Sequence, residues 1–284
     1  VTVLDFATGT GTFLIEILQQ IFDNLQQSAK KELIIQNHIL KNMYGFEYLI
    51  APYTVAHLKL SQFLKEKNYE LKDKERFQVF LTNTLEPTDK QVRIPLLPAL
   101  SKESTDAQAI KDKPILAIVG NPPYSVSSSN KSNFIDKLMK KYKEGLNEKN
   151  IQSLSDDYIK FIRFAHHKIE NIGQGVIAII TNNSYLSGSI HRKMRESLYN
   201  DFDKIYILNL HGNSLRKEQG ENVFDIRVGV SILFLVKIDA PQKEKQTFYF
   251  SMQDNEILKR EDKFNFLKNS SLDSIHWKKI QPQQ

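Results

Sequence analysis

The chain has 284 residues and no cysteine, which excludes disulfides, thiolate metal sites and cysteine nucleophiles. Its formal charge of +6 permits contact with a polyanion, although a basic soluble protein of any function can carry the same charge. Hydrophobic residues make up 40% of the chain, and no apolar run approaches the roughly 20 residues that span a bilayer. We therefore expect a cytoplasmic protein with a substantial core and no membrane segment.

Short apolar runs rich in β-branched residues recur along the chain, and helical patterns separate most of them. The seven expected strands are residues 1–5, 43–47, 77–81, 115–120, 176–180, 204–210 and 228–236. The expected helices are residues 13–25, 51–65, 156–172 and 191–199. This alternation predicts an α/β fold with a mostly parallel sheet. The last two strands have no helix between them, which predicts an antiparallel edge strand.

Two segments depart from this alternation. Residues 86–114 contain three prolines and mixed charges, so we expect an irregular insertion there. Residues 240–284 are polar, and we interpret them as a tail or as the start of a following module. Residues 1–239 would then form the catalytic core. Because the chain opens inside a strand pattern, we expect it to be part of a longer polypeptide.

The first candidate site lies at residues 5–13, where a strand, a glycine turn and a helix follow one another. Gly9 and Gly11 can take positive φ angles and let a ligand approach the backbone, and the free amides of the helix start attract polar groups. No Gly-Lys-Ser or Gly-Lys-Thr follows, which excludes a Walker loop, and the third glycine of a nicotinamide-binding turn is absent. The pattern predicts a nucleotide-like cofactor, although a βα turn without a ligand can have the same glycines.

Glu47 and Asn83 follow the second and third expected strands. A carboxylate at the end of the second strand of such a fold can accept both hydroxyls of a ribose. The Asn83 amide can hydrogen-bond the edge of a bound adenine. The alternatives are an exposed strand-end charge for Glu47 and a turn-forming asparagine for Asn83.

The tetrad Asn121-Pro122-Pro123-Tyr124 follows the fourth expected strand. Asn121 offers a side-chain acceptor, the prolines hold a main-chain carbonyl in one direction, and Tyr124 offers a flat π-face. Together they suit a planar base held by its amino group, at the carboxyl end of a strand where open α/β sheets bind ligands. The alternative is an ordinary turn after a strand.

Two further features have competing interpretations. Phe224 lies in a loop before the last expected strand and can either stack on an extruded base or anchor the loop on the core. His166 and His167 are adjacent on a helix, so they do not face each other, and no carboxylate spacing supports a metal site. We interpret both histidines as helix surface and expect no metal.

In their order along the chain, these motifs resemble the DNA methyltransferases that methylate amino groups with S-adenosylmethionine. The glycine motif before the Asn-Pro-Pro-Tyr tetrad is the arrangement of their gamma class, the N6-adenine enzymes. Residues 44–60 and 212–225 look closest to the methyltransferase region of large single-chain, type I-like, helicase-fused restriction-modification enzymes. The resemblance extends over residues 1–237, and it implies a Rossmann-like methyltransferase fold with a seven-stranded sheet.

The resemblance also implies a role for each motif residue. Cofactor binding would involve Asp5, Ala7, Thr8, Gly9, Gly11, Phe13, Glu47 and Asn83. The catalytic residues would be Asn121, Pro122, Pro123 and Tyr124, and Phe224 would pack on the other face of the target base. The cofactor would be S-adenosylmethionine, and the partner would be double-stranded DNA with a flipped adenine.

Helicase, nuclease and target-recognition domains of the same longer polypeptide would be further partners. Such enzymes usually have a cap helix before the glycine motif and a recognition domain after the core, so we expect the chain alone to bind the cofactor weakly and to methylate poorly. The alternatives are an RNA-base or protein-glutamine methyltransferase, or a catalytically incomplete DNA- or cofactor-binding fragment. The expected insertion at residues 86–114 and the loop at residues 211–225 favour DNA.

Overall fold

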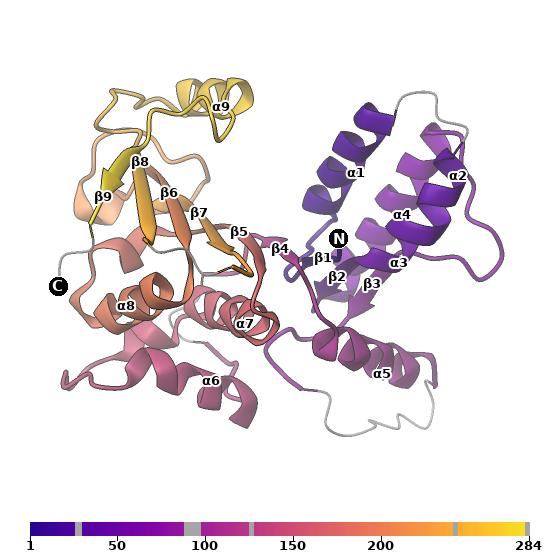
Figure 1. Ribbon diagram of the computed structural model, residues 1–284, viewed down its shortest axis with the longest axis horizontal. Helices are drawn as coiled ribbons and strands as arrows, with labels where there is room; N and C mark the ends of the chain where they lie inside the picture. Colours follow the sequence, from indigo (N-terminus) through magenta and orange to yellow (C-terminus); the bar gives the residue numbers. More distant parts are fainter. Residues whose placement is uncertain (26–29, 88–97, 125–127, 241–243, 282–284) are drawn as a thin grey trace. The chain divides into compact units, whose positions relative to one another are not determined.

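The computed structural model of the chain describes residues 1–25, 30–87, 98–124, 128–240 and 244–281 (Figure 1). It divides into two compact units. Unit 1 comprises Val1–Asn121 and Ser132–Phe134, and unit 2 comprises Pro122–Lys131 and Ile135–Gln284. The chain first passes from one unit to the other inside the Asn-Pro-Pro-Tyr tetrad.

Unit 1 contains four parallel strands. Their order is β3 (Gln78–Leu81), β2 (Met43–Glu47), β1 (Val3–Asp5) and β4 (Ala117–Gly120). Because the strands are parallel, their carboxyl ends lie at one edge, where open α/β sheets bind ligands. The glycine turn, Glu47, Asn83 and Asn121 each lie at the end of one of these strands or directly beyond it, so they all belong to this edge.

The helices of unit 1 pack around these strands. They are α1 (Thr12–Leu25), α2 (Lys31–Ile34), α3 (Leu40–Asn42), α4 (Ile50–Glu66) and α5 (Pro98–Asp112), with a π-helical turn at Ile35–Ile39. Figure 1 shows α1 and α4 on one side of the strands and α5 on the other. An apolar cluster including Leu14, Leu18, Leu60, Leu64 and Val79 joins α1 and α4 to the strands.

The prediction of an irregular insertion is wrong over α5. Pro98 stands at the first helical position, where its missing N–H is not needed. Glu103, Ala107 and Lys111 recur every four residues and are all buried, so they form one inward face of the helix. Residues 88–97 of the expected insertion lie outside the described residues.

Unit 2 contains five strands in the order β5 (Gly175–Asn182), β7 (Val230–Lys237), β6 (Lys204–His211), β8 (Gln246–Ser251) and β9 (Lys278–Ile280). Strand β7 is antiparallel to both neighbours, β8 is parallel to β6, and β9 is an antiparallel edge strand. The predicted α/β class is confirmed. The strand count is corrected from seven to nine in the described residues, because β8 and β9 lie in the segment interpreted as a polar tail.

The helices of unit 2 are α6 (Asn133–Lys143, whose first two residues belong to unit 1), α7 (Asp157–Ile172), α8 (Arg192–Asp201) and α9 (Arg260–Asn269). Figure 1 shows α6, α7 and α8 below the strands of this unit and α9 above them. Helix α7 begins at its N-cap Asp156 and ends at Gly173, whose φ is +85°, as the sequence predicts. None of the helices in the described ranges is both long and apolar enough to cross a membrane.

The C-terminal segment packs on the rest of unit 2. Strand β8 pairs with β6 over six positions, and the Phe250 ring of β8 stacks on Phe266 of α9 at 5.1 Å. Trp277 meets the Tyr206 ring of β6 edge-on at 5.3 Å. The boundary expected after residue 239 stays a prediction, while residues 244–281 supply two strands and a helix of this unit.

Candidate active site

The glycine turn after β1 is bonded to the neighbouring strand β2. The Thr8 amide donates to the Phe46 carbonyl at 2.9 Å, and the Thr8 hydroxyl donates to the Asp5 carbonyl at 3.1 Å. Gly9 and Gly11 have φ angles of +55° and +84°, the left-handed region that favours glycine. Both glycines thus use the conformational freedom that the sequence offers at this turn.

The glycine turn is closely packed against β2 at Thr8 and has open space at Gly9. A Cβ at Gly45 of β2 would lie 2.6 Å from the Thr8 hydroxyl oxygen, so this position requires glycine. A Cβ at Gly9 would meet no described atom within 4 Å. Ala7 and Phe13 are half-buried on either side. The backbone at Gly9 is therefore open to a ligand.

Glu47 at the end of β2 bonds directly to the glycine turn. Its Oε2 accepts from the Gly9 amide at 2.8 Å, and its Oε1 accepts from the Leu49 amide at 2.7 Å. A carboxylate has about four lone-pair sites, so these two bonds leave capacity for two further donors. The bond from Gly9 thus joins the glycine turn to Glu47, which lies 38 residues later in the chain.

Asp5 is fully buried beneath the turn. Its Oδ1 accepts from the Ala7 amide at 3.2 Å, whereas its Oδ2 has no hydrogen-bond partner among the described residues. Burial raises the pKa of the Asp5 carboxyl from 3.8 to about 7, the Ala7 amide opposes the rise, and the nearby Glu47 charge adds to it. An unpartnered buried carboxyl oxygen is costly for folding alone, so it marks the turn as a candidate ligand site.

Asn83 lies in the segment that follows β3. Its Oδ1 accepts from the Leu85 amide at 3.0 Å, which is the turn-forming role. The hydroxyl of the neighbouring Thr84 donates to the Phe6 carbonyl at 2.6 Å, and this bond ties the segment to the glycine turn. The adenine contact of Asn83 stays a prediction.

Lys111 of α5 supports the same segment, and sequence reasoning did not identify it. Its ammonium donates to the Thr82 hydroxyl at 3.0 Å and to the Asn83 and Glu86 carbonyls at 2.6 Å each. Burial lowers the pKa of Lys111 from 10.5 to about 8, with the Glu86 charge opposing this effect. No local pattern marks this lysine, because its partners lie 25 to 29 residues earlier in the chain.

The tetrad follows β4, which pairs with β1. Asn121 and Pro123 are exposed, Pro122 is buried and Tyr124 is half-buried. The Tyr124 ring meets the Tyr158 ring edge-on, with centroids 6.1 Å apart and planes 86° apart. Burial raises the pKa of the Tyr124 hydroxyl, and the Asp156 charge adds to this, so the phenol stays protonated.

Phe224 lies in unit 2, in the loop between β6 and β7. Its amide donates to the Asn222 Oδ1 at 2.9 Å, and its half-buried ring packs against an apolar cluster that includes Val223 and Phe250. The Asn222 Nδ2 donates to the carbonyls of Gly212 and Val228 at 3.0 and 2.7 Å. The packing gives Phe224 an anchoring role in the loop, and its contact with a base stays a prediction.

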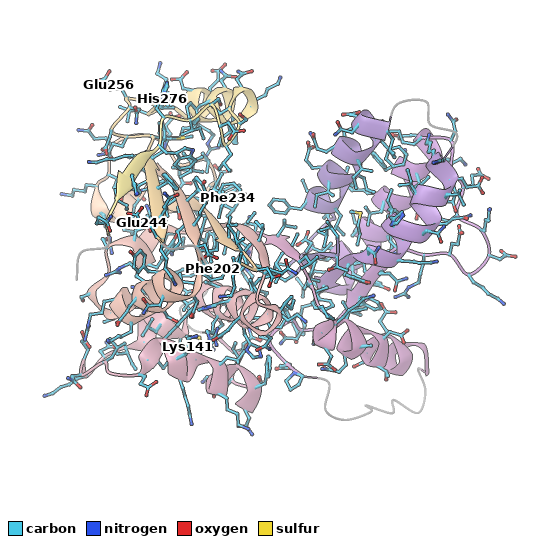
Figure 2. All side chains as sticks on the ribbon, viewed as in Figure 1. Lys141, Phe202, Phe234, Glu244, Glu256 and His276 are labelled. Atoms are coloured by element: carbon cyan, nitrogen blue, oxygen red, sulfur yellow. The ribbon has the colours of Figure 1, made fainter. Side chains whose placement is uncertain are left out.

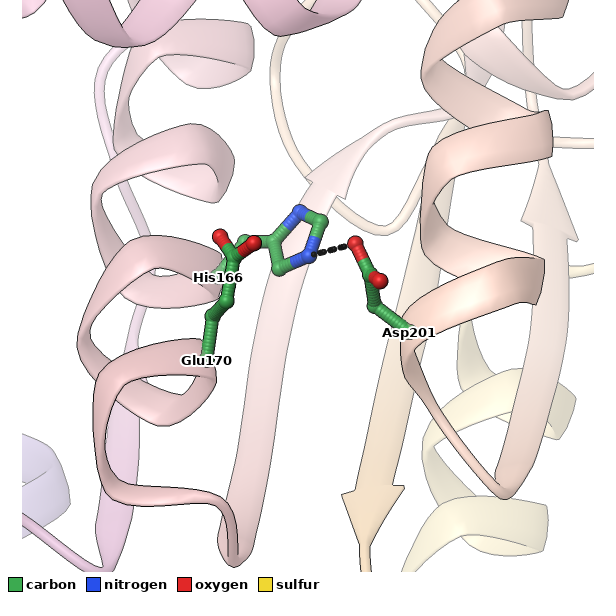
Figure 3. A group of neighbouring side chains, drawn as sticks. All are labelled: His166, Glu170 and Asp201. Atoms are coloured by element: carbon green, nitrogen blue, oxygen red, sulfur yellow. Dashed lines mark hydrogen bonds and ion pairs between the residues drawn. The ribbon is translucent and has the colours of Figure 1, made fainter.

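The interpretation of His166 as helix surface is wrong. His166 is fully buried, and its Nε2 lies 2.8 Å from the Asp201 Oδ2 (Figure 3). The centroid of its ring lies 5.1 Å from that of Phe202, which is labelled in Figure 2. The error arises because the partner, Asp201, lies on α8, 35 residues further along the chain.

The side chains of His166, Glu170 and Asp201 are of the types that bind metal ions. The ligand atoms of His166, Glu170 and Asp201 lie within 4.8 Å of one another. The Lys141 ammonium, however, lies 2.6 Å from the Glu170 Oε1 and 2.7 Å from the Asp201 Oδ2. The lysine therefore supplies the positive charge that these carboxylates need, and the group acts as a salt-bridge network.

Comparison with known proteins adds a family and several relatives. The model of the Eco57I restriction-modification methylase family matches residues 41–215. The type II methyltransferase M.BstVI of Geobacillus stearothermophilus is 24% identical over 212 residues, which are 74% of this chain and 34% of that protein.

Solved structures of restriction-modification enzymes are similar over the whole chain. The ATP-dependent type ISP enzyme LlaBIII, bound to DNA, has a TM-score of 0.85 and 28% identity. A nuclease-deletion mutant of the type ISP enzyme LlaGI, with a DNA substrate mimic, has a TM-score of 0.86 and 26% identity. Both comparisons cover 100% of this chain but only 20% and 24% of those proteins.

Proposed function

The chain belongs to the Eco57I restriction-modification methylase family, and on that premise we propose that it methylates the exocyclic amino group of adenine in DNA, with S-adenosylmethionine as the methyl donor. The observation that carries the proposal is the shared strand edge of unit 1, in the order β3-β2-β1-β4. Cofactor candidates follow three of these strands, and the tetrad follows the fourth. A cofactor and a methyl acceptor would thus meet at one edge.

The residues at this edge fit S-adenosylmethionine. The Asp5 Oδ2, buried and without a partner in the described ranges, suits a donor from the methionine part of the cofactor. The remaining lone pairs of Glu47 suit the two ribose hydroxyls. The open space at Gly9 lets the ligand approach the backbone between these two carboxyl groups.

The tetrad would hold the target base. S-adenosylmethionine supplies a methyl group that its sulfonium already activates, so the task of the protein is to position and orient. The Asn121 side-chain oxygen and the Pro122 carbonyl would accept the two hydrogens of the adenine amino group. These acceptors favour a pyramidal nitrogen and stabilise the positive charge that develops on it. Tyr124 would stack on the base and keep the amino group in line.

DNA is the proposed substrate, and the target adenine would leave the duplex to reach the tetrad. The structures of LlaBIII and LlaGI, complexes with DNA or a DNA mimic, support this substrate over RNA or protein. Because the chain spans only 20% of LlaBIII, we propose that helicase, nuclease and target-recognition domains of one longer polypeptide act with it.

Calorimetry with S-adenosylmethionine, followed by tritiated methyl transfer to DNA, RNA and protein, tests the proposal. We expect label in DNA, recovered as N6-methyladenine after digestion to nucleosides. Asn121→Ala should lower transfer at least about 100-fold and leave cofactor affinity unchanged, since it removes an acceptor that we assign to the base and not to the cofactor. Asn171→Ala, at an exposed position in α7, is the matched control.

Three results would contradict the proposal. Label in RNA or in a protein glutamine would indicate the alternative substrates. Cofactor binding without transfer to any of the three would indicate a catalytically incomplete subunit. Transfer by Asn121→Ala at the wild-type rate would remove the tetrad from the mechanism.

A further inference from the structure

Unit 2 gathers polar side chains around Tyr158, whose ring meets Tyr124 of the tetrad. We call Tyr124, Tyr158 and Tyr185, with Asp156 and Arg216, the tyrosine cluster. Tyr158 lies in the first turn of α7, and its ring meets Tyr124 edge-on at 6.1 Å. The members of the cluster come from the tetrad, α7, the turn after β5 and the loop after β6, and each of the others interacts with Tyr158.

The hydroxyls of Tyr158 and Tyr185 are both buried without a hydrogen-bond partner among the described residues, and of these two rings it is that of Tyr158 that meets Tyr124. Tyr158 is 1% exposed, and its hydroxyl has no hydrogen-bond partner among the residues that the structure describes. Burial raises its pKa well above the usual value, with smaller contributions from Asp156 and Tyr185, and Arg216 opposes the rise. The hydroxyl therefore keeps its proton and can donate. Buried hydroxyls are nearly always bonded, so this one points to a ligand that supplies an acceptor.

The orientation of the rings limits what Tyr158 can do. Its plane stands 86° from that of Tyr124, so a base lying flat on Tyr124 cannot also stack on Tyr158. Tyr158 would act through its hydroxyl instead. Once Asn121 and Pro122 take the amino hydrogens of adenine, the ring nitrogens remain as in-plane acceptors that need a donor.

We propose that the Tyr158 hydroxyl donates a hydrogen bond to a ring nitrogen of the base that stacks on Tyr124, and so selects an adenine. This inference rests on the proposed function, because it assigns a base to the tetrad. Tyr158 thereby becomes a specificity-determining residue from α7, outside the motifs that the sequence singles out. A hydrogen bond to a base edge discriminates strongly, because an analogue without the acceptor leaves the buried donor unpaired.

The first experiment uses Tyr158→Phe, which removes one oxygen and keeps the ring. We expect kcat/KM for unmethylated phage DNA to fall about tenfold, and the affinity for S-adenosylmethionine to stay unchanged. The melting temperature should rise by about 2 °C, because an unpartnered buried hydroxyl has been removed. Tyr142→Phe is the control. Its hydroxyl bonds the His166 Nδ1 at 2.9 Å, so its loss should lower the melting temperature and leave transfer unchanged.

The second experiment does not depend on turnover. Single-stranded oligodeoxyadenosine is compared with oligonucleotides of 1-deaza-, 3-deaza- and 7-deazaadenine by fluorescence anisotropy. The wild type should bind one deaza analogue about tenfold more weakly than adenine, and Tyr158→Phe should lose that discrimination. A purely structural role of Tyr158 would not produce this coupling.

The possible outcomes are distinct. A raised melting temperature with unchanged kcat/KM, or equal wild-type affinity for all four oligonucleotides, would overturn the inference. A joint fall of cofactor affinity and transfer in Tyr158→Phe would also overturn it, since it would indicate a disturbed fold. Failure of the wild type to bind S-adenosylmethionine would instead refute the proposed function.

Discussion

Replacing Asp5 by asparagine should stabilise the protein and weaken cofactor binding. The Asp5 carboxyl is buried, one of its oxygens has no partner among the described residues, and burial raises its pKa from 3.8 to about 7. Between these two values the folded state binds more protons than the unfolded state. The free energy of unfolding therefore falls as the pH rises through this range, and the stability that this group contributes is fully lost above about pH 7.

The two pKa values of Asp5 give the size of the effect. Ionisation of the Asp5 carboxyl lowers the free energy of unfolding by about 2 kcal/mol at about pH 5 and by about 4 kcal/mol at about pH 8, relative to the protonated form. The asparagine side chain of the variant stays neutral at both, so the advantage of Asp5→Asn over the wild type should grow by about 2 to 3 kcal/mol across this interval. Affinity for S-adenosylmethionine should fall about tenfold, because the variant lacks a charged acceptor.

Urea unfolding of both proteins at the two pH values, with calorimetry at neutral pH, measures these quantities. Asp23→Asn on α1 is a matched control, because it makes the same substitution at an exposed position outside the candidate site. A stability difference that is constant from about pH 5 to about pH 8 would refute the assignment of a raised pKa to Asp5. Unchanged cofactor affinity in Asp5→Asn would remove Asp5 from the cofactor site.

Four further predictions follow from single contacts. Gly45→Ala should lower stability by about 1–3 kcal/mol in urea unfolding and weaken cofactor binding in calorimetry, because the new Cβ would lie 2.6 Å from the Thr8 hydroxyl oxygen. Lys263→Met should lower the free energy of unfolding by about 2–3 kcal/mol in the same assay, because the buried ammonium donates to two backbone carbonyls that would lose this partner. Lys141→Met should lower the free energy of unfolding by about 2 kcal/mol, because Glu170 and Asp201 lose their shared cation. Added zinc should then raise the melting temperature of the variant and leave that of the wild type unchanged. Phe224→Leu should lower the melting temperature, because the ring packs in an apolar cluster, and it should lower methyl transfer about tenfold if the ring also stacks on a base. Wild-type transfer would leave only the anchoring role.

The strand edge of unit 1 could be predicted from the sequence because each of its signals is local. The four strands are short apolar runs. A glycine turn follows β1, a carboxylate ends β2, the polar residues Thr82–Thr84 follow β3, and a pair of prolines lies after β4. β1 and β2 end at Asp5 and Glu47, as the pattern predicts. The bond between Gly9 and Glu47 follows from this topology, because parallel neighbours place their carboxyl ends together.

The features that the sequence did not reveal depend on contacts between distant residues. Helix α5 is held by Glu103, which accepts from Arg76 at 2.9 Å and from Tyr53 at 3.0 Å, and these partners lie 27 and 50 residues earlier. No local periodicity encodes such bonds, and proline-rich flanks obscured the helix. The burial of His166 has the same kind of cause, since its carboxylate partner lies on another helix.

The C-terminal segment shows how mean composition can hide structure. Averaged over residues 240–284 the chain is polar, yet Gln246–Ser251 forms a strand that pairs with β6 along its whole length. From α9, the Arg260 guanidinium donates to the Asn222 carbonyl and to the Asp225 carboxylate at 2.7 Å each, and the Lys263 ammonium donates to the Glu221 carbonyl at 2.6 Å. The loop that carries Phe224 is thus fixed by residues about 40 positions later in the chain. A base-facing role for that loop would therefore require the C-terminal segment as well as the motif-bearing strands.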